Sequence, residues 1–471
     1  RPFFLFKDNH SKGKKQTKNI DYSIENTDFL ALGLAKYFDK KAIENLARTS
    51  GFVQRKSKLD GEKFLNVLMF INQFGKNLSL SDISGDLYNQ YDLKLKKQSI
   101  DQRFNQRAVV FLKKVLTCVL ESHLKTTSND ENLSKFNRIR IKDSTRFALP
   151  SAFAQIYKGH GGATANSESM ISIQYEYDML SSDTLDLRLT SGTRNDQLDA
   201  KENTHDIVEN DLFIRDLGYA TLGYLSQIIT NGAYFLNRLN SQTTVYRVEN
   251  PEEKMDFDKC QKKLKKYNLP YLEYKVFIGK KAQIPCRLII YPASQDAYQR
   301  RMRKVTKQAK SYGYQVSDDY KTKAQLTFYI TNAEESKIPA SKIKQVYGLR
   351  WQIELTFKIW KSQTNIDKVK MMKIHRFECQ LIGKLLWLLI HWKIYKYLEG
   401  WINRNHINKS CSPWKYYKHV LKINSVVRNV ISKPDGVRYL LFNLTQIAAN
   451  LFDLEKRKRK PSHYQTLMTL N

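Results

Sequence analysis

Arg138-Ile-Arg-Ile-Lys-Asp143 alternates charged and apolar residues and then stops at Ser144-Thr145. Alternation with a period of two predicts a half-buried β-strand, and this strand ends in a carboxylate. A second short apolar strand, Leu212-Phe-Ile-Arg-Asp216, ends in the same way, and Leu217-Gly218-Tyr219 then turns the chain. Two predicted strands that each end in an aspartate are the basis for predicting both the fold and the function.

The segments around these two strands predict an α/β fold. Met170–Tyr177 and Leu185–Thr190 also alternate, which predicts a hairpin or meander. Leu222–Ile229 has the apolar spacing of a helix. Three strands, a fourth after a polar linker, and then helices make an α/β arrangement.

Residues 234–333 interrupt this scheme with a mostly β segment. Its predicted strands are Tyr234–Arg238, Thr243–Val248, Tyr274–Ile278, Cys286–Tyr291 and Gln325–Thr331. A basic helix, about Asp296 to Tyr312, lies between the last two of them. After Pro339 helical spacing resumes, over Lys342–Ser362 and then over Phe377–Leu398.

The N-terminal part is predicted to be helical and to contact DNA. Residues 29–127 have helical spacing, with a short helix from Leu80 to Tyr88 for which Ser81 is the predicted N-cap. A second helix, about Gln98 to Ala108, carries Arg103 and Arg107. Helix, short turn and basic helix are compatible with helix-turn-helix DNA binding, although any small helical bundle contains such pairs.

The net charge favours a polyanionic partner. Lys and Arg together number 79 against 46 Asp and Glu, which gives a formal charge of +33. Such self-repulsion destabilises a compact fold unless a polyanion relieves it, and the phosphate backbone of DNA is the usual one. The alternative is a protein from a generally basic, Lys- and Asn-rich proteome with no nucleic-acid role.

The remaining composition fits a protein of a reducing cytoplasm without a membrane span. The five cysteines are scattered, with no spacing typical of zinc sites or of a disulfide framework. The most apolar stretch, Leu381–Ile390, contains Lys384 and is too short and too charged to cross a bilayer. It is predicted to be a buried helix.

The helix predicted over 342–362 carries four polar side chains on one edge of its apolar stripe. At about 100° per residue, Tyr347, Arg350, Glu354 and Lys361 fall within an arc of roughly 60°. One interpretation is a solvated face with an i,i+4 ion pair between Arg350 and Glu354. The other joins Glu354 to the two strand-ending aspartates, because such an acidic cluster holds two Mg²⁺ ions for in-line phosphoryl transfer.

The same residues carry a resemblance to a known family. Tyr347-x2-Arg350-x3-Glu354-x6-Lys361 resembles the Y-R-E-K signature of the bacterial insertion-sequence transposases of family four, of the DDE class. Asp143-Ser-Thr and Asp216-Leu-Gly-Tyr resemble the first and second catalytic aspartates of that family, on a ribonuclease-H-like core. The resemblance covers roughly residues 75–400, and its Y-R-E-K spacing is the specific part.

The resemblance implies a cut-and-paste DNA transposase. Asp143, Asp216 and Glu354 would be catalytic and would ligate two Mg²⁺ ions, for which Mn²⁺ may substitute. Tyr347, Arg350 and Lys361 would hold phosphates of the DNA. Arg238 resembles an arginine of the family that touches the DNA backbone, with a structural ion pair as the equal alternative. The implied partners are double-stranded transposon ends and target DNA, and a second copy of the chain in a synaptic homodimer. The implied location is the bacterial cytoplasm, in association with the nucleoid.

Alternatives remain for both the ligands and the function. Rival carboxylates between the proposed ligands are Asp178, the best rival to Asp143, and Asp183, Asp186, Asp196 and Asp206. Rival functions are a ribonuclease-H-like nuclease without strand transfer and an inactive DNA-binding descendant.

The predicted organisation is a basic flexible N-terminus (1–27), a helical DNA-binding domain (28–130), a ribonuclease-H-like core in two parts (131–233 and 336–400) around a β-rich insertion (234–335), and a helical C-terminal region with a basic tail (401–471).

Overall fold

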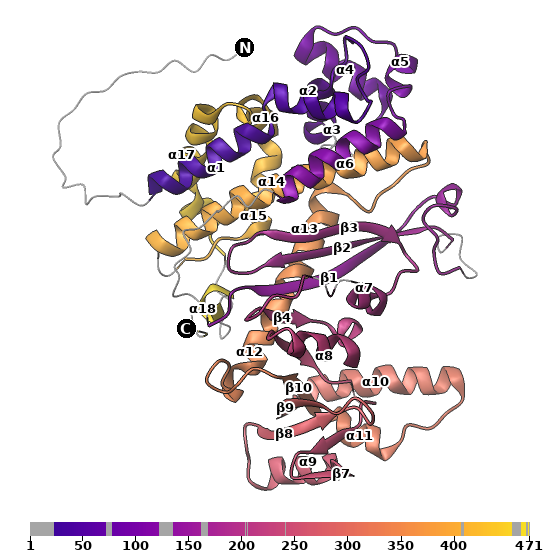
Figure 1. Cartoon of the computed structure of the whole chain (residues 1–471), viewed down its shortest axis with the longest axis vertical. Coiled ribbons are helices and arrows are strands. Elements are labelled where there is room, and N and C mark those ends of the chain that lie inside the picture. Colours follow the sequence, from indigo (N-terminus) through magenta and orange to yellow (C-terminus); the bar gives the residue numbers. More distant parts are fainter. Residues whose placement is uncertain are drawn as a thin grey trace, which may run out of the picture.

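The structure is a computed structural model of the whole chain, shown in Figure 1. It describes residues 23–71, 78–121, 135–161, 168–202, 204, 206–240, 242–406, 409–454, 463–467 and 470. The predicted flexible N-terminus, apart from its last residues, and the basic run 456–460 lie outside the described residues.

One ten-stranded mixed sheet runs through the molecule in the order β3-β2-β1-β4-β5-β10-β9-β8-β6-β7. β1 pairs antiparallel with β2 and parallel with β4, and β4 pairs parallel with β5. The strands are β1 (Ile139–Ala148), β2 (Met170–Asp178), β3 (Thr184–Ser191), β4 (Leu212–Arg215), β5 (Tyr234–Arg238), β6 (Val245–Arg247), β7 (Asn250–Lys254), β8 (Leu272–Ile278), β9 (Ile284–Pro292) and β10 (Leu326–Thr331). The predicted mixed α/β class is therefore confirmed.

Strand β1 departs from its prediction in two ways. It runs past Asp143 to Ala148, because β2 pairs with it as far as Met170. It is also buried on both faces at its start, although its alternation predicted a half-buried strand. Its charged face is covered because Arg140 and Lys142 form ion pairs with carboxylates of neighbouring elements.

The predicted insertion shares this sheet with the core. β5 pairs with β4 on one side and with β10 on the other, so the segment that begins at Tyr234 continues the sheet of the core. All five predicted strands are present, and β7 is an additional one. Its helices are α9 (Phe257–Lys266), the predicted basic helix α10 (Gln295–Tyr312), and α11 (Asp318–Ala324).

The helices from both ends of the sequence pack together around α14 (Ile374–Asn405), the predicted buried helix (Figure 1). Its neighbours include α1, α3 and α6 from the N-terminal part and α15 and α17 from the C-terminal part. These helices are α1 (Ser23–Tyr37), α2 (Lys40–Thr49), α3 (Gly61–Phe70), α4 (Leu80–Tyr91), α5 (Lys97–Asp101), α6 (Gln106–Glu121), α15 (Pro413–Lys422), α16 (Asn424–Val430), α17 (Pro434–Leu451) and α18 (His463–Leu467). Among the described residues, no helix is long and apolar enough to cross a membrane.

The predicted helix-turn-helix differs from the structure at the start of its first helix and within its second helix. α4 begins after Ser79, which forms a capping box with Asp82, so the predicted N-cap Ser81 is wrong. The helix predicted over 98–108 is divided into α5 and α6. The division occurs because the side chain of Asn105 accepts a hydrogen bond from the backbone N–H of Ala108 and starts a new helix.

Candidate active site

Two carboxylates from distant parts of the chain meet at one arginine, and a third lies beside the first of them. The last paired residues of β1 and β4 are Lys142 and Arg215, so Asp143 and Asp216 follow side by side in the parallel register. Nη1 of Arg350 lies 3.1 Å from Oδ2 of Asp143, and its Nη2 forms an ion pair with Glu354. The fold thus places Asp143 and Asp216 beside one another and brings Glu354 of the helix to the arginine that also contacts Asp143.

The helix that brings these groups together is not regular. The run predicted over 342–362 consists of α12 (Ile343–Tyr347), a 3₁₀ turn at Gly348–Arg350, and α13 (Trp351–Thr364), which carries Glu354. In a 3₁₀ turn, side chains three residues apart lie above one another. The guanidinium of Arg350 accordingly lies 5.9 Å from the centre of the Tyr347 ring.

Tyr347 connects the site to the insertion. Its hydroxyl lies 3.5 Å from Oδ1 of Asp216. Its ring packs on Tyr329 of β10 at 5.2 Å between ring centres, and Tyr329 packs in turn on Tyr291 of β9. Burial raises the pKa of Tyr347 well above its ordinary value, so the phenol stays protonated and can donate a hydrogen bond.

The charge state of Asp143 depends on its neighbours. The pKa of Asp143 is raised to about 6, chiefly by burial. The backbone N–H of Ser144 and the guanidinium of Arg350 oppose this rise, whereas the nearby carboxylates of Asp216 and Asp196 add to it. Crowded carboxylates disfavour ionisation unless a cation joins them. The site therefore favours positive charge, which Arg350 supplies in this arrangement.

The donor set suits a divalent metal. Carboxylate oxygens are the hard ligands that Mg²⁺ takes, and the side chains of Asp143 and Glu354 are 20% and 32% exposed, which leaves oxygens accessible. Within the described residues, no three His, Cys, Asp or Glu side chains already form a ligand cluster. The carboxylates do not form such a cluster because Arg350 lies between two of them. A metal ion would compete with Arg350 for the same oxygens.

The other predicted DNA-contacting residues lie in different settings. Lys361 donates a hydrogen bond of 3.2 Å to the backbone oxygen of Arg146 on β1. Arg238 lies at the end of β5, near enough to Tyr347 to influence its pKa, and the described residues include no ion-pair partner for it. Arg103 donates to the backbone oxygen of Leu59 and stacks on Phe52, whereas Arg107, in the first turn of α6, is exposed.

Four of the five rival carboxylates have structural partners. Asp178 accepts backbone hydrogen bonds from Ile139, Leu180 and Ser181, and so holds the turn after β2. The remaining ion pairs are Asp183 with Lys393, Asp186 with Lys142 and Arg188, and Asp206 with Arg140.

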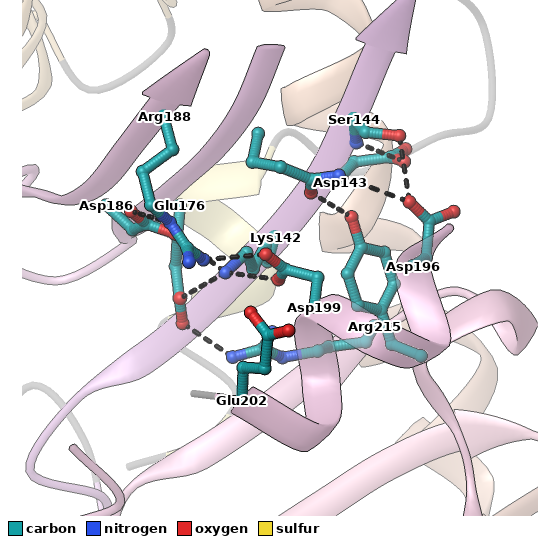
Figure 2. Close-up of polar contacts among 12 residues, drawn as sticks. Lys142, Asp143, Ser144, Glu176, Asp186, Arg188, Asp196, Asp199, Glu202 and Arg215 are labelled. Carbon is teal, nitrogen blue, oxygen red and sulfur yellow. Dashed lines mark hydrogen bonds and ion pairs between the residues drawn. The ribbon is translucent and has the colours of Figure 1, made fainter. Parts of the chain in front are cut away.

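Asp196 also has partners, but they belong to the segment that follows Asp143, so this rival carboxylate stands beside the site. Its Oδ1 accepts a hydrogen bond from Ser144 at 3.0 Å (Figure 2). The same oxygen accepts a second hydrogen bond from Arg146 at 3.2 Å. A Cβ atom at Gly218 would lie 3.1 Å from its Oδ2, so the glycine after Asp216 lets this carboxylate approach the turn. Only this close approach, which the sequence does not show, identifies Asp196 as a neighbour of the site.

A buried ion cluster supports the strand that carries Asp143 (Figure 2). Glu176 on β2 accepts hydrogen bonds of 2.8 Å from both Arg140 and Arg215. Lys142 pairs at 2.7 Å with Asp199 of α7 (Asp196–Glu202). Burial alone would raise the pKa of Glu176, but Arg140, Arg215 and Lys142 hold it below its ordinary range. Buried charges are tolerated here because each one is paired.

Comparison with known proteins gives consistent matches. A family model described as the transposase DDE domain matches residues 134–390. The transposase for insertion sequence element IS231F of Bacillus thuringiensis subsp. israelensis is 33% identical over 369 residues, 75% of this chain and 77% of that protein. The IS231B transposase of subsp. berliner is 30% identical over 447 residues, 91% of each chain, and the IS1151 transposase of Clostridium perfringens is 30% identical over 382 residues, 77% and 79%.

Among solved structures, the piggyBac transposase synaptic complex with hairpin DNA aligns over 93% of this chain and 88% of that chain. Its TM-score is 0.44 and its sequence identity is 11%.

Proposed function

The chain belongs to the DDE transposase family and is a DNA transposase, and from this premise we propose that Asp143, Asp216 and Glu354 are its catalytic carboxylates. The observation that carries the proposal is the position of Arg350. Its guanidinium contacts Asp143 and Glu354 while the neighbouring Tyr347 reaches Asp216, so residues 143, 216, 347, 350 and 354 form one group.

Members of the family use divalent metals, and here the three carboxylates would hold two Mg²⁺ ions, or Mn²⁺ in their place. Bound there, the metals would activate the attacking oxygen and stabilise the charge on the leaving oxygen. Arg350, with its planar fork of donors, suits a phosphate oxygen. The protonated Tyr347 hydroxyl is a further donor beside it.

The wider surroundings support a role in strand transfer. A nuclease that only hydrolyses needs neither the Tyr347–Arg350 pair nor the strands that hold Tyr347 in place through Tyr329. The strand order β3-β2-β1-β4-β5, antiparallel and then parallel, supports a ribonuclease-H-like core. Because two DNA ends must be processed together, we propose that the chain acts as a homodimer.

Cleavage of end-sequence DNA by wild type and by Glu354→Gln tests the proposal. Glutamine keeps the shape of the side chain but removes the charge that metal binding needs, so we expect DNA binding to persist and Mg²⁺-dependent cleavage to fall by about 10³-fold or more. Glu335→Gln, an exposed glutamate outside the site, is the matched control. Equal cleavage by the wild type and Glu354→Gln would exclude the assignment, and cleavage by the wild type without joining of a labelled end to plasmid would favour a nuclease.

A further inference from the structure

Helix α10 presents a row of cations on its outer face. Arg300, Arg303, Lys304, Lys307 and Lys310 are all exposed. At about 100° per residue they fall within an arc of roughly 120°. The helix is bounded by the N-cap Ser294 and by Gly313 in the left-handed conformation, so the whole row lies on one ordered helix.

The opposite face fixes the orientation of the helix. Val305 and Ala309 are buried, and Arg301 donates hydrogen bonds to the backbone oxygens of Ala324 and Leu326. A third bond joins Arg301 to the hydroxyl of Thr327 on β10. The outward direction of the cations therefore follows from how α10 is anchored, and it is present before any partner binds.

The row has no acidic counterpart. Within the described part of the chain, none of these five cations has an ion pair. The aspartates that follow α10, Asp318 and Asp319, are paired with Lys321 and Lys323. Asp296 is the only acidic residue of α10 and lies in its first turn, where it interacts favourably with the helix dipole.

A further cation lies between the anchored face of α10 and the active site. The charge of Arg238 on β5 acts both on Tyr347 of the site and on Arg301 of α10. Among the residues that the structure describes, Arg301 forms no ion pair with a carboxylate, and its hydrogen bonds go to Ala324, Leu326 and Thr327. Two neighbouring guanidinium groups without an acid between them repel one another, and an anion near them would relieve that repulsion.

We propose that the outer face of α10 binds the phosphate backbone of the double-stranded DNA that enters the active site, independently of its sequence. The proposal rests on the proposed function for the presence of DNA at the site. From Arg300 to Lys310 the helix rises by about 15 Å. A duplex carries one charge per about 1.7 Å of its axis, so a stretch of that length holds about nine phosphate charges on its two strands together, and only part of them can face the row. Five cations on one face suit such a partner.

The salt dependence of DNA binding tests the inference. The double variant Arg303→Gln/Lys307→Gln is compared with Lys262→Gln/Lys321→Gln, a matched pair from the neighbouring helices α9 and α11 whose cations are already paired with Asp258 and Asp318. Full-length proteins are titrated with two labelled duplexes in EDTA, one with the terminal sequence of the element and one scrambled. For the test pair, the slope of log K against log salt should become less negative by about 2.

The loss of two phosphate contacts should also reduce the affinity of the variant for DNA by roughly 60-fold at about 0.1 M salt. The factor should be the same for both duplexes. An unchanged slope, an equal change in the control pair, or a loss confined to the terminal sequence would overturn the inference. The measurement needs no divalent metal and leaves Glu354 intact. A changed slope together with cleavage by Glu354→Gln would therefore overturn the catalytic assignment alone.

Discussion

At the scale of single residues, the site is a group of neighbouring carboxylates held in place by a few hydrogen-bond donors. Arg350 contacts two of them directly, and Asp196 adds a fourth negative charge that is held by Ser144 and Arg146. Both donors bind the same oxygen of Asp196, its Oδ1. We infer that it positions the strand segment beside Asp143 and increases the attraction of the site for cations.

Asp196→Asn tests this role. The amide oxygen can still accept from Ser144 and Arg146, but the charge is lost. We expect the Mg²⁺ concentration for half-maximal cleavage to rise roughly tenfold, since about 1.4 kcal/mol of charge interaction is a factor of ten. The melting temperature should change little. Asp435→Asn, at an exposed position in the first turn of α17, is the control, and an unaltered Mg²⁺ requirement in Asp196→Asn would refute the role.

At the scale of elements, the position of Glu354 depends on both ends of α13. Its N-terminal end is the 3₁₀ turn that aligns Tyr347 with Arg350. At its C-terminal end, the buried Lys384 of α14 donates to the backbone oxygens of Thr364, at 2.8 Å, and Asn365. A lysine at this end satisfies carbonyls that have no partner within the helix and interacts favourably with the helix dipole.

Lys384→Met should lower the stability of the protein. The methionine fills the space but leaves the buried carbonyl of Thr364 without its donor, which costs about 1–3 kcal/mol. A lower midpoint of denaturant unfolding would show this loss. Lys344→Met, an exposed lysine on α12, should leave the midpoint unchanged. A midpoint at or above that of wild type in Lys384→Met would contradict the assignment of Lys384 as a cap.

At the scale of the whole molecule, two long-range arrangements hold the site in place. The continuous sheet joins the core to the strands that support Tyr347. The helices from the N-terminal and C-terminal parts of the chain both pack on α14. In addition, Arg428 of α16 forms a two-pronged ion pair with Asp86 of α4. The helical regions predicted as separate N- and C-terminal parts therefore form one layer against the sheet (Figure 1).

Acid should weaken this helical layer through His391 of α14. The ring packs against Trp387 at a tilt, its Nδ1 lies 3.0 Å from the hydroxyl of Tyr416, and burial lowers its pKa to about 3. In the unfolded chain it takes up a proton near pH 6.5, so the free energy of unfolding should fall by up to about 1.4 kcal/mol per pH unit from about 6.5 towards 3.

His391→Gln removes this proton uptake. In denaturant unfolding between about pH 4 and 6.5, the variant should lose stability less steeply than wild type, by up to about 1.4 kcal/mol per pH unit. His406→Gln, at the less buried end of α14, is the control and should follow wild type. Parallel pH profiles for wild type and His391→Gln would exclude His391 as the source.

Local patterns predicted much of this structure. The strands around Asp143 and Asp216, the basic helix α10 and the buried α14 are visible in the sequence because apolar spacing follows the period of each element. The break at Asn105 was missed, because a short side chain competed locally with the helix. The burial of Arg140 and Lys142 was also missed, since their partners lie on other elements.

The sequence by itself determined which elements form and which residue types are available to them: two aspartates after paired strands, a glutamate on a helix and an excess of positive charge. Only the tertiary structure decided that Arg350 lies between Asp143 and Glu354, that Asp196 stands beside them, and that the insertion continues the sheet of the core. The physical reason is how far along the chain each kind of interaction acts. Hydrogen bonding and apolar periodicity act between near neighbours in the chain, whereas contacts between carboxylates and cations depend on strand register and helix packing.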